Sequence, residues 1–324
     1  MSSLICAVGD THGHLQLALC MIAHWQREQS IVFEAVFLCG DVATFTSEEQ
    51  LDKATRRHGK TNPCELEFLY QWSVKPFSSW LKMIFQSEDY SGLGLTCPIV
   101  MVHGNHEGFS HLQTFVSTVP MGEMVEINRL PTVDSGGFIR YLPSGCRCRT
   151  RSGVIVGGIG GIEIGQRRAE YHNLAYLDDA AILQFLKNPP VDLLITHQGP
   201  SSIQGDGGSD SLQKLLDARR MRCWCHGHSI HRPEIVDAGP NSRVRVVPLK
   251  DATFIKPSDD PGRDCFAAIR FNSSEEPSSS RNDLPTKLVA LSPEKLVSTR
   301  RAASCLSRFG TICWKRNVLD RFPY

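Results

Sequence analysis

The fold of this chain is decided by the stretch Pro98-Ile-Val-Met-Val-His-Gly-Asn-His-Glu107. Its first half, Ile99 to Val102, is an apolar and mostly β-branched run, which predicts a short buried strand between a proline and a glycine. Three polar side chains of different chemistry follow directly: Asn105, His106 and Glu107. Because α/β sheets bind ligands at the carboxyl ends of their strands, the stretch predicts an α/β fold with a site at this edge, provided that other strand ends supply partners.

The N-terminal part of the chain shows the same pattern twice. Leu4 to Val8 predicts a strand that ends at Gly9-Asp10-Thr11-His12, and Ala35 to Cys39 predicts a second strand that ends at Gly40-Asp41. Between them, residues 15–29 carry apolar side chains at the spacing of a helix with one buried face. The chain therefore opens with a βαβ unit whose two strands both end in Gly-Asp.

The remaining elements follow from periodicity and from the positions of glycine and proline. Residues 43–97 form a long insertion, in which 48–58 predict a polar helix and 64–88 predict one or two amphipathic helices broken at Pro76. Further helices are expected over 109–116, 177–187 and 211–218, and further strands over 138–142, 147–151, 154–159, 191–196, 222–225 and 243–248. Two of these strands lead directly into histidines: His197 and the segment His226-Gly-His-Ser-Ile-His231.

Composition limits the classes of protein to which the chain can belong. It has 324 residues, of which 41% are hydrophobic and 21% charged, with a net charge of +1, so no global charge marks a nucleic-acid or membrane binder. No apolar run approaches the ~18 residues that a membrane span needs. The twelve cysteines are scattered and no export signal is visible, so we expect reduced thiols in a cytoplasmic protein, with the nucleus as the alternative location. The pairs Cys146-x-Cys148 and Cys223-x-Cys225 lack the spacing of a zinc knuckle.

We expect the chain to divide into one folded domain over residues 1–255, with 43–97 as its helical insertion, and two further segments. Residues 256–286 contain Asn-Ser-Ser-Glu-Glu-Pro-Ser-Ser-Ser-Arg, which has the composition of a flexible linker. The tail over 287–324 carries eight Lys or Arg residues against two acidic residues, and its pattern predicts no particular fold.

Five predicted strand ends deliver polar groups: Asp10 and His12, Asp41, Asn105 and His106, His197, and the histidines between 226 and 231. Each has an ordinary structural explanation, since Asp and Asn are common in turns, but five coincidences at strand ends favour a shared site. Carboxylate, imidazole and amide ligands suit Mn, Fe, Zn or Mg. Asp41 has two oxygens with which to bridge two ions, and two ions about 3.5–4 Å apart would hold a hydroxide for in-line attack on a phosphate.

The same residues, in the same order, resemble the calcineurin-like metallophosphoesterase superfamily. Its motifs D-x-H, G-D, G-N-H-[DE], H and G-H-x-H correspond here to Asp10-Thr-His12, Gly40-Asp41, Gly104-Asn-His-Glu107, His197 and Gly227-His228. The resemblance spans roughly residues 4 to 250. It implies a four-layer α/β/β/α sandwich of two mixed sheets, and a metal-dependent hydrolase of phosphoesters.

The resemblance also implies a role for each matched residue. One divalent ion would be held by Asp10, His12, Asp41 and a histidine of the last motif, and the other by Asp41, Asn105, His197 and His228. His106 would donate a proton to the leaving oxygen. Of the candidate metals, manganese is favoured.

The last motif departs from the superfamily pattern, because Ile230 stands where its second histidine belongs. A bulge would bring His231, one residue later, into the site. Alternatively His226 would serve, because it has i, i+2 spacing to His228. We expect His231 to complete the first metal site, with His226 as the alternative.

Further motifs narrow the class of phosphoester. The segment after Gly40-Asp41 lacks the Asp-Arg-Gly of protein phosphatases and dinucleoside-polyphosphate hydrolases. By contrast, residues 110–113, 156–162 and 194–200 are similar to segments of RNA lariat-debranching enzymes, although those enzymes typically use Cys where this chain has Asp10. A phosphodiester substrate is therefore expected, with RNA or a nucleotide as the narrower expectation.

Three arginine clusters offer contacts for a polyanionic substrate, although solvated loop charges explain each cluster equally well. The clusters are Arg147/Arg149/Arg151, Arg167/Arg168 and Arg219/Arg220/Arg222. Two other functions fit the same fold: a small-molecule phosphomonoesterase, and a catalytically weak scaffold that binds proteins. A scaffold has no need for all of the predicted site residues, so an enzyme is the favoured interpretation.

Overall fold

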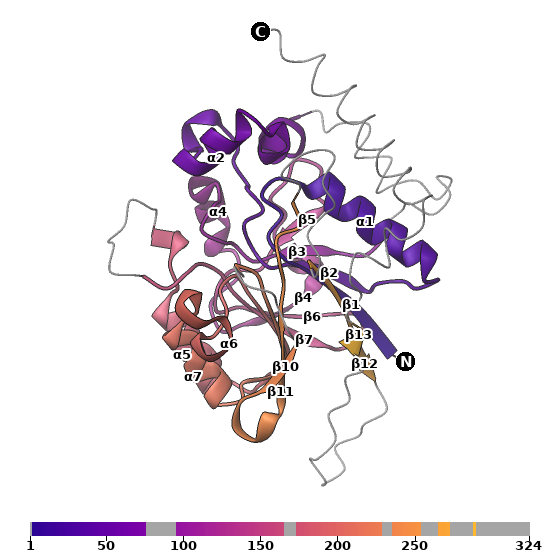
Figure 1. Cartoon of the computed structure of the whole chain (residues 1–324), viewed down its shortest axis with the longest axis vertical. Coiled ribbons are helices and arrows are strands. Elements are labelled where there is room, and N and C mark those ends of the chain that lie inside the picture. The colour runs from indigo at the N-terminus through magenta and orange to yellow at the C-terminus, as the bar shows by residue number, and fades with distance from the viewer. Residues whose placement is uncertain are drawn as a thin grey trace.

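The computed structural model describes residues 2–75, 95–164, 173–228, 235–253, 265–272 and 288–289, and their strands form two mixed sheets (Figure 1). The first sheet has the order β13-β12-β1-β2-β3-β5, with β1 Ser2–Val8, β2 Ala35–Leu38, β3 Ile99–Met101, β5 Ile139–Tyr141, β12 Phe266–Asn272 and β13 Leu288–Val289. The second has the order β10-β11-β9-β8-β7-β6-β4, with β4 Met124–Glu126, β6 Arg147–Arg149, β7 Ile155–Ile159, β8 Val191–Thr196, β9 Met221–His226, β10 Val236–Ala238 and β11 Val244–Pro248.

Helices cover the two outer faces of this pair of sheets (Figure 1). One side carries α1 Leu15–Glu28, α2 Lys53–Gly59 and α4 Phe109–Val116, and the other carries α5 Asp179–Lys187, α6 Ser201–Gln204 and α7 Asp210–Asp217. Within the described part of the chain, short helical turns also connect these elements: η1 Glu48–Gln50, η2 Pro63–Leu66, η3 Phe68–Trp72, η4 Ile127–Arg129, η5 Asn173–Ala175, η6 Gly205–Gly207 and η7 Pro240–Ser242.

Three apolar clusters separate four layers of secondary structure. The first lies between α1 and the first sheet, the second between the two sheets, and the third between the second sheet and helices α5 and α7. Side chains alternate along each strand, so Cys6 and Val8 of β1 pack in the first cluster while Ile5 and Ala7 pack in the second. The expected α/β/β/α sandwich of two mixed sheets is confirmed.

Parallel pairing brings the polar loops to one edge. β1, β2 and β3 are parallel neighbours in the first sheet, and β7, β8, β9 and β11 are parallel neighbours in the second. Backbone hydrogen bonds join the loops that follow them: the N–H of His12 donates to the carbonyl of Asp41 (2.7 Å), and the N–H of Ala252 donates to the carbonyl of Asp10 (2.7 Å). The loops of both sheets therefore meet around the end of β1.

Most predicted elements lie within one or two residues of their observed bounds. The helix expected over 15–29 is α1, and its predicted apolar face is buried. The helix expected over 48–58 is instead η1 and α2, because the side chain of Asp52 accepts a hydrogen bond from the N–H of Thr55 (2.8 Å) and starts a new helix there. Over 64–75 the chain forms only the turns η2 and η3, and residues 76–94 lie outside the described part.

The segment that we expected to be a linker contributes a strand to the first sheet. Residues 266–272 of the 256–286 segment form β12, which pairs antiparallel with β1 from Ser2↔Asn272 to Val8↔Phe266. Its side chains alternate between two apolar clusters, with Phe266 and Ala268 in one and Ala267 and Ile269 in the other. The sheet thus extends past residue 255, while the division of the chain into a domain and a tail stays a prediction.

Nine cysteines whose side chains the structure describes carry free thiols: Cys6, Cys39, Cys64, Cys97, Cys146, Cys148, Cys223, Cys225 and Cys265. The two C-x-C pairs, one at the start of β6 and one on β9, are buried in the cluster between the sheets, where they pack as small apolar side chains. In the described segments, no helix combines the length and the apolar character needed to span a bilayer.

Candidate metal centre

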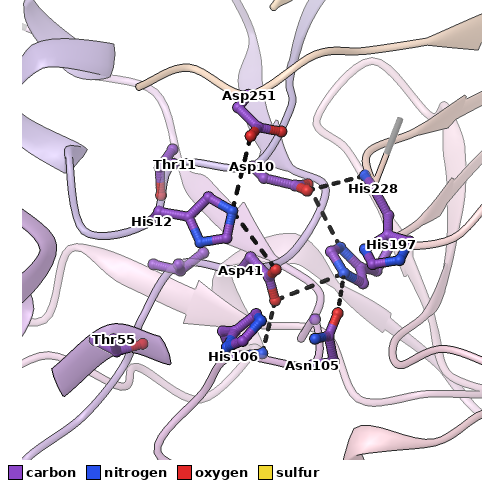
Figure 2. Close-up of polar contacts among 12 residues, drawn as sticks. Asp10, Thr11, His12, Asp41, Thr55, Asn105, His106, His197, His228 and Asp251 are labelled. Atoms are coloured by element: carbon purple, nitrogen blue, oxygen red, sulfur yellow. Dashed lines mark hydrogen bonds and ion pairs between the residues drawn. The ribbon is translucent and has the colours of Figure 1, made fainter. Parts of the chain in front are cut away.

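Four candidate ligands converge where the parallel strands end (Figure 2). Asp10, Asp41, His197 and His228 each offer one ligand atom, and these atoms all lie within 4.8 Å of one another. They follow β1, β2, β8 and β9, respectively. Nδ1 of His197 lies 3.5 Å from Oδ1 of Asp10, and its Nε2 lies 3.6 Å from Oδ1 of Asp41. Side chains up to 218 residues apart in the sequence therefore form one cluster of ionisable groups.

The backbone at this edge is held in an unfavourable conformation. His12, Asp41 and His228 have φ values of 41°, 46° and 50°, in the left-handed region that favours glycine. Such strain persists only where the surrounding structure imposes it, and it clusters at functional sites. One such restraint is the N–H of His228, which donates to Oδ2 of Asp10 (2.9 Å). These loops are therefore shaped around the polar groups they present.

Two glycines allow the carboxylates to lie against neighbouring backbone. A methyl group on Gly104 would place its carbon 2.0 Å from Oδ1 of Asp41, and one on Gly227 would place it 1.9 Å from Oδ1 of Asp10. Any larger residue at either position would therefore displace a carboxylate. This contact explains on physical grounds why glycine precedes Asn105 and His228 in the two motifs.

His197 is fully buried between the two carboxylates. Its Nε2 lies 2.9 Å from Oδ1 of Asn105, and its Nδ1 lies 3.1 Å from the carbonyl of Cys39. Burial disfavours the charged imidazole, but the charges of Asp41 and Asp10 outweigh burial and raise the pKa of His197 to about 10. Burial likewise disfavours the charged form of Asp41, yet His197 and other nearby histidines hold its pKa well below the usual range. The two carboxylates therefore favour positive charge on His197, whereas burial and the charge of His197 lower the pKa of His228 to about 4.

Glu107 acts as a clamp for the loops. It is buried, and its carboxylate accepts hydrogen bonds from the N–H groups of Val42 (2.8 Å) and Thr44 (2.9 Å) and from the hydroxyl of Thr44 (2.7 Å). Burial raises the pKa of Glu107 to about 7, with Asp41 adding to the shift. The carboxylate that ends the central motif thus ties the loop after β3 to the loop after β2, and fixes the position of Asp41.

His106 lies beside this pocket and is oriented by an acid from the helical insertion. Its backbone N–H donates to Oδ1 of Asp41 (2.8 Å), and its Nδ1 lies 2.8 Å from Oδ2 of Asp52. Burial opposes protonation of His106, but the hydrogen bond with Asp52 and the charge of Asp41 outweigh it and raise its pKa to about 9. With Nδ1 held by Asp52, Nε2 is the nitrogen available for exchange of a proton with a bound molecule.

A second group of ligand atoms shares Asp10. Asp10, His12 and Asp251 offer atoms within 4.8 Å of one another, and Nε2 of His12 lies 3.8 Å from Oδ2 of Asp41 and 4.0 Å from Oδ2 of Asp251 (Figure 2). The structure therefore brings together Asp10, His12, Asp41, Asn105, His106, His197 and His228, all of which were predicted from the sequence.

Of the two histidines that could complete the last motif, His226 lies in the described part of the structure and His231 does not. His226 is buried at the end of β9, with Nδ1 2.9 Å from the carbonyl of Gly227 and with no hydrogen-bond partner for Nε2 among the described residues. It belongs to neither group of converging ligand atoms in the described structure. His231 lies outside the described residues, so its predicted role stays a prediction.

The family model for calcineurin-like phosphoesterases matches residues 3–232. The chain belongs to the calcineurin-like phosphoesterase family. This calcineurin-like phosphoesterase has no significant match among curated protein sequences. The matched range holds every residue of the two groups of ligand atoms except Asp251.

Solved structures of similar chains add little beyond that assignment. TT1561 of Thermus thermophilus is 13% identical, with a TM-score of 0.42 over 78% of this chain and 90% of that chain. Another solved structure is also 13% identical, with a TM-score of 0.47 over 83% of this chain and 95% of that chain. Similarities of this size carry no argument about the site.

The residues of this calcineurin-like phosphoesterase fit divalent metal ions. Oδ1 of Asp10 is buried and accepts no hydrogen bond within the described segments, although a buried carboxylate oxygen normally has a partner. A bound cation would satisfy that oxygen and offset the charge of Asp41 beside it. Carboxylates and imidazoles are ligands for borderline and hard metals. The residues present therefore match the divalent ions that this family typically binds.

Two residues of the site were missed in the sequence analysis. Asp251 follows β11, so it obeys the same rule that polar groups at strand ends build the site. Asp52 has no such signal, because its contact with His106 spans 54 residues and depends on how the insertion folds back over the sheet edge.

Proposed function

We propose that this calcineurin-like phosphoesterase is a metal-dependent phosphodiesterase. The observation that carries the proposal is the convergence of two buried carboxylates, Asp10 and Asp41, with the imidazoles of His197 and His228 within 4.8 Å. When bound there, two divalent ions would supply a hydroxide nucleophile and the positive charge that offsets the phosphate. Manganese is the metal that we favour, and a cytoplasmic location is part of the same proposal.

The proposal gives each side chain a task. The ions are held by Asp10, Asp41, His197 and His228. His12 completes the ligands of the first ion, and Asn105 completes those of the second. The position of Asn105 supports this task, because its side chain oxygen already faces His197 at 2.9 Å. The backbone strain at His12, Asp41 and His228 supports it further, since it fixes the ligands before a substrate arrives.

His106 is the proton donor in the proposed reaction. A phosphoester oxygen leaves more readily when it is protonated, and general acids of this kind contribute about 10²–10⁴-fold to a rate. The carboxylate of Asp52 holds Nδ1 of His106 and so directs Nε2 towards the leaving oxygen. Asp52 is thereby a positioning residue, which acts on the substrate only through His106.

The arginine clusters give little support to the narrower expectation that the substrate is RNA or a nucleotide. Arg220 donates to the carbonyl of Phe185 (2.8 Å) and Arg222 pairs with Asp192 (3.7 Å), at the start of β9 and away from the end that carries His226. Arg149 pairs with Glu126 (3.6 Å), and its strand partner Ile155 begins β7 at the same remote edge. We therefore rest the proposal on a phosphodiester. The resemblance to lariat-debranching enzymes stays a prediction.

The test is turnover of bis-p-nitrophenyl phosphate, a diester, compared with p-nitrophenyl phosphate, a monoester, both with added Mn²⁺. We expect the diester to have the higher kcat/KM. Asp10→Asn and His106→Ala should each lower the rate by about 10² or more while the circular dichroism spectrum stays unchanged. His58→Ala is the matched control, because His58 is an exposed histidine of α2 in neither group of ligand atoms.

Each contrary result points to a specific alternative. Preference for the monoester would favour a phosphomonoesterase. Absence of turnover of both substrates with Mn, Fe, Zn and Mg would favour the protein-binding scaffold. Near-normal rates in both Asp10→Asn and His106→Ala would remove the assignment of the site.

A further inference from the structure

The loop after β11 supplies an acid where the sequence motif lacks a histidine. The superfamily pattern places a second histidine at position 230, and this chain has isoleucine there. Asp251 lies three residues after the end of β11, which is the parallel neighbour of β9. A residue at the end of the adjacent strand therefore reaches the same edge of the sheet as the motif itself.

Three backbone contacts hold this loop in place, one at the end of β9 and two at the end of β1. The N–H of Leu249 donates to the carbonyl of His226 (2.7 Å), and the N–H of Ala252 donates to the carbonyl of Asp10 (2.7 Å). At Gly9, an added methyl carbon would lie 2.0 Å from the carbonyl oxygen of Lys250, so the two chain segments touch. Asp251 stands between these anchor points, and its position is fixed by the same strands that position Asp10.

The side chain of Asp251 faces His12. Its Oδ2 lies 4.0 Å from Nε2 of His12 (Figure 2). Asp10, His12 and Asp251 each offer one ligand atom, and these three atoms lie within 4.8 Å of one another. This separation is wide for a hydrogen bond but suits two ligands on one ion, whose donor atoms each lie about 2.0–2.2 Å from the metal. The side chain of Asp251 is half exposed, so its carboxylate is also open to solvent.

We propose that Asp251 is a protein ligand of the first metal ion, together with Asp10, His12 and Asp41. The inference rests on the proposed metal-dependent function and adds a residue beyond the range matched by the family model. A carboxylate in place of an imidazole makes this ligand set richer in oxygen. Oxygen ligands suit Mn²⁺ and Mg²⁺ better than they suit softer metals. The first site should therefore prefer Mn²⁺ to Zn²⁺ more strongly than the second.

The experiment is to count bound ions in Asp251→Ala and Asp251→Asn. The full chain is dialysed against a fixed free concentration of Mn²⁺, bound manganese is measured by mass spectrometry, and electron paramagnetic resonance distinguishes coupled Mn pairs from single ions. We expect two ions in the wild type and one in each variant, with loss of the coupled signal. The affinity for the lost ion should fall by more than about tenfold, since even partners of ligands contribute 10–100-fold.

Two further variants make the result specific. Asp179→Asn removes an exposed acid at the start of α5 and should keep both ions. His231→Ala tests the histidine that the sequence analysis favoured. The proposal is overturned if Asp251→Ala keeps both ions with unchanged affinity, or if the wild type binds fewer than two. Two bound ions without diester turnover would defeat the proposed function and leave this ligand assignment in place.

Discussion

Replacing Gly104 with alanine should displace the carboxylate of Asp41 and thereby remove most of the activity. The added carbon would lie 2.0 Å from Oδ1 of Asp41 and 2.4 Å from its backbone nitrogen, whereas such contacts essentially never fall below 3.0 Å. Rotation of the Asp41 side chain cannot relieve the clash with its backbone nitrogen, so that nitrogen must move by about 0.6 Å and Oδ1 by about 1 Å to reach 3.0 Å. A misplacement of about 1 Å in a catalytic constellation lowers rates by about 10²-fold. Overpacking also destabilises by about 1–3 kcal/mol.

The measurement is kcat/KM for bis-p-nitrophenyl phosphate with Mn²⁺, together with the thermal unfolding midpoint. Gly157→Ala is the matched control, because a methyl carbon there would lie 2.4 Å from Cε1 of Phe185, in the apolar cluster beneath α5. We expect both variants to lose stability by a similar amount and only Gly104→Ala to lose activity by about 100-fold. Activity of Gly104→Ala within threefold of Gly157→Ala would refute the claim that the position of Asp41 controls the reaction.

Three other predictions follow from the contacts described. Asp52→Ser keeps a residue that can cap α2 but removes the carboxylate that orients His106, so kcat should fall about tenfold or more while KM and the unfolding midpoint hold. Burial raises the pKa of Glu67 to about 8, from an ordinary 4.5, against the lowering effect of hydrogen bonds from Trp72 and Gln16. Its contribution to stability is therefore full below about pH 4.5 and is lost as the pH rises through about 8, so the wild-type urea midpoint should drop between pH 6 and 8 and that of Glu67→Gln should drop less. Mn²⁺ at 100 times its Kd should stabilise the fold by about 2.7 kcal/mol for each ion bound, relative to EDTA, and Asp10→Asn should lose most of the resulting shift in the unfolding midpoint.

Most of the framework could be predicted because it depends on local patterns. Runs such as Ile99–Met101 and the Leu-Leu-Ile centre of Val191–Thr196 are apolar on both faces, as strands covered by other layers must be, and their ends are marked by glycine or by a polar residue. The candidate ligands share those ends, so finding the strands also found Asp10, Asp41 and His197. The rule that connects strand ends to a common edge requires no knowledge of the pairing order.

The remainder depends on contacts between distant segments. Nothing in the composition of residues 265–272 reveals that they pair with residues 2–8, and the polar stretch that follows them favoured a linker. The break at Asp52 reflects a capping hydrogen bond that competes with a continuous helix, and helical periodicity alone cannot rank the two. Asp251 does lie at a strand end, but its approach to His12 depends on packing between the two sheets, which no local pattern shows.

The pairing of β12 with β1 determines when the first sheet can be completed during synthesis. Until residues 266–272 leave the ribosome, one edge of β1 has exposed backbone groups along its whole length, from Ser2 to Val8. β1 also positions Asp10 and His12. During synthesis this early strand therefore stays open to aggregation until the much later strand β12 has been made. Chains truncated before residue 266 would expose the unpaired edge of β1, and we expect them to aggregate or to bind chaperones.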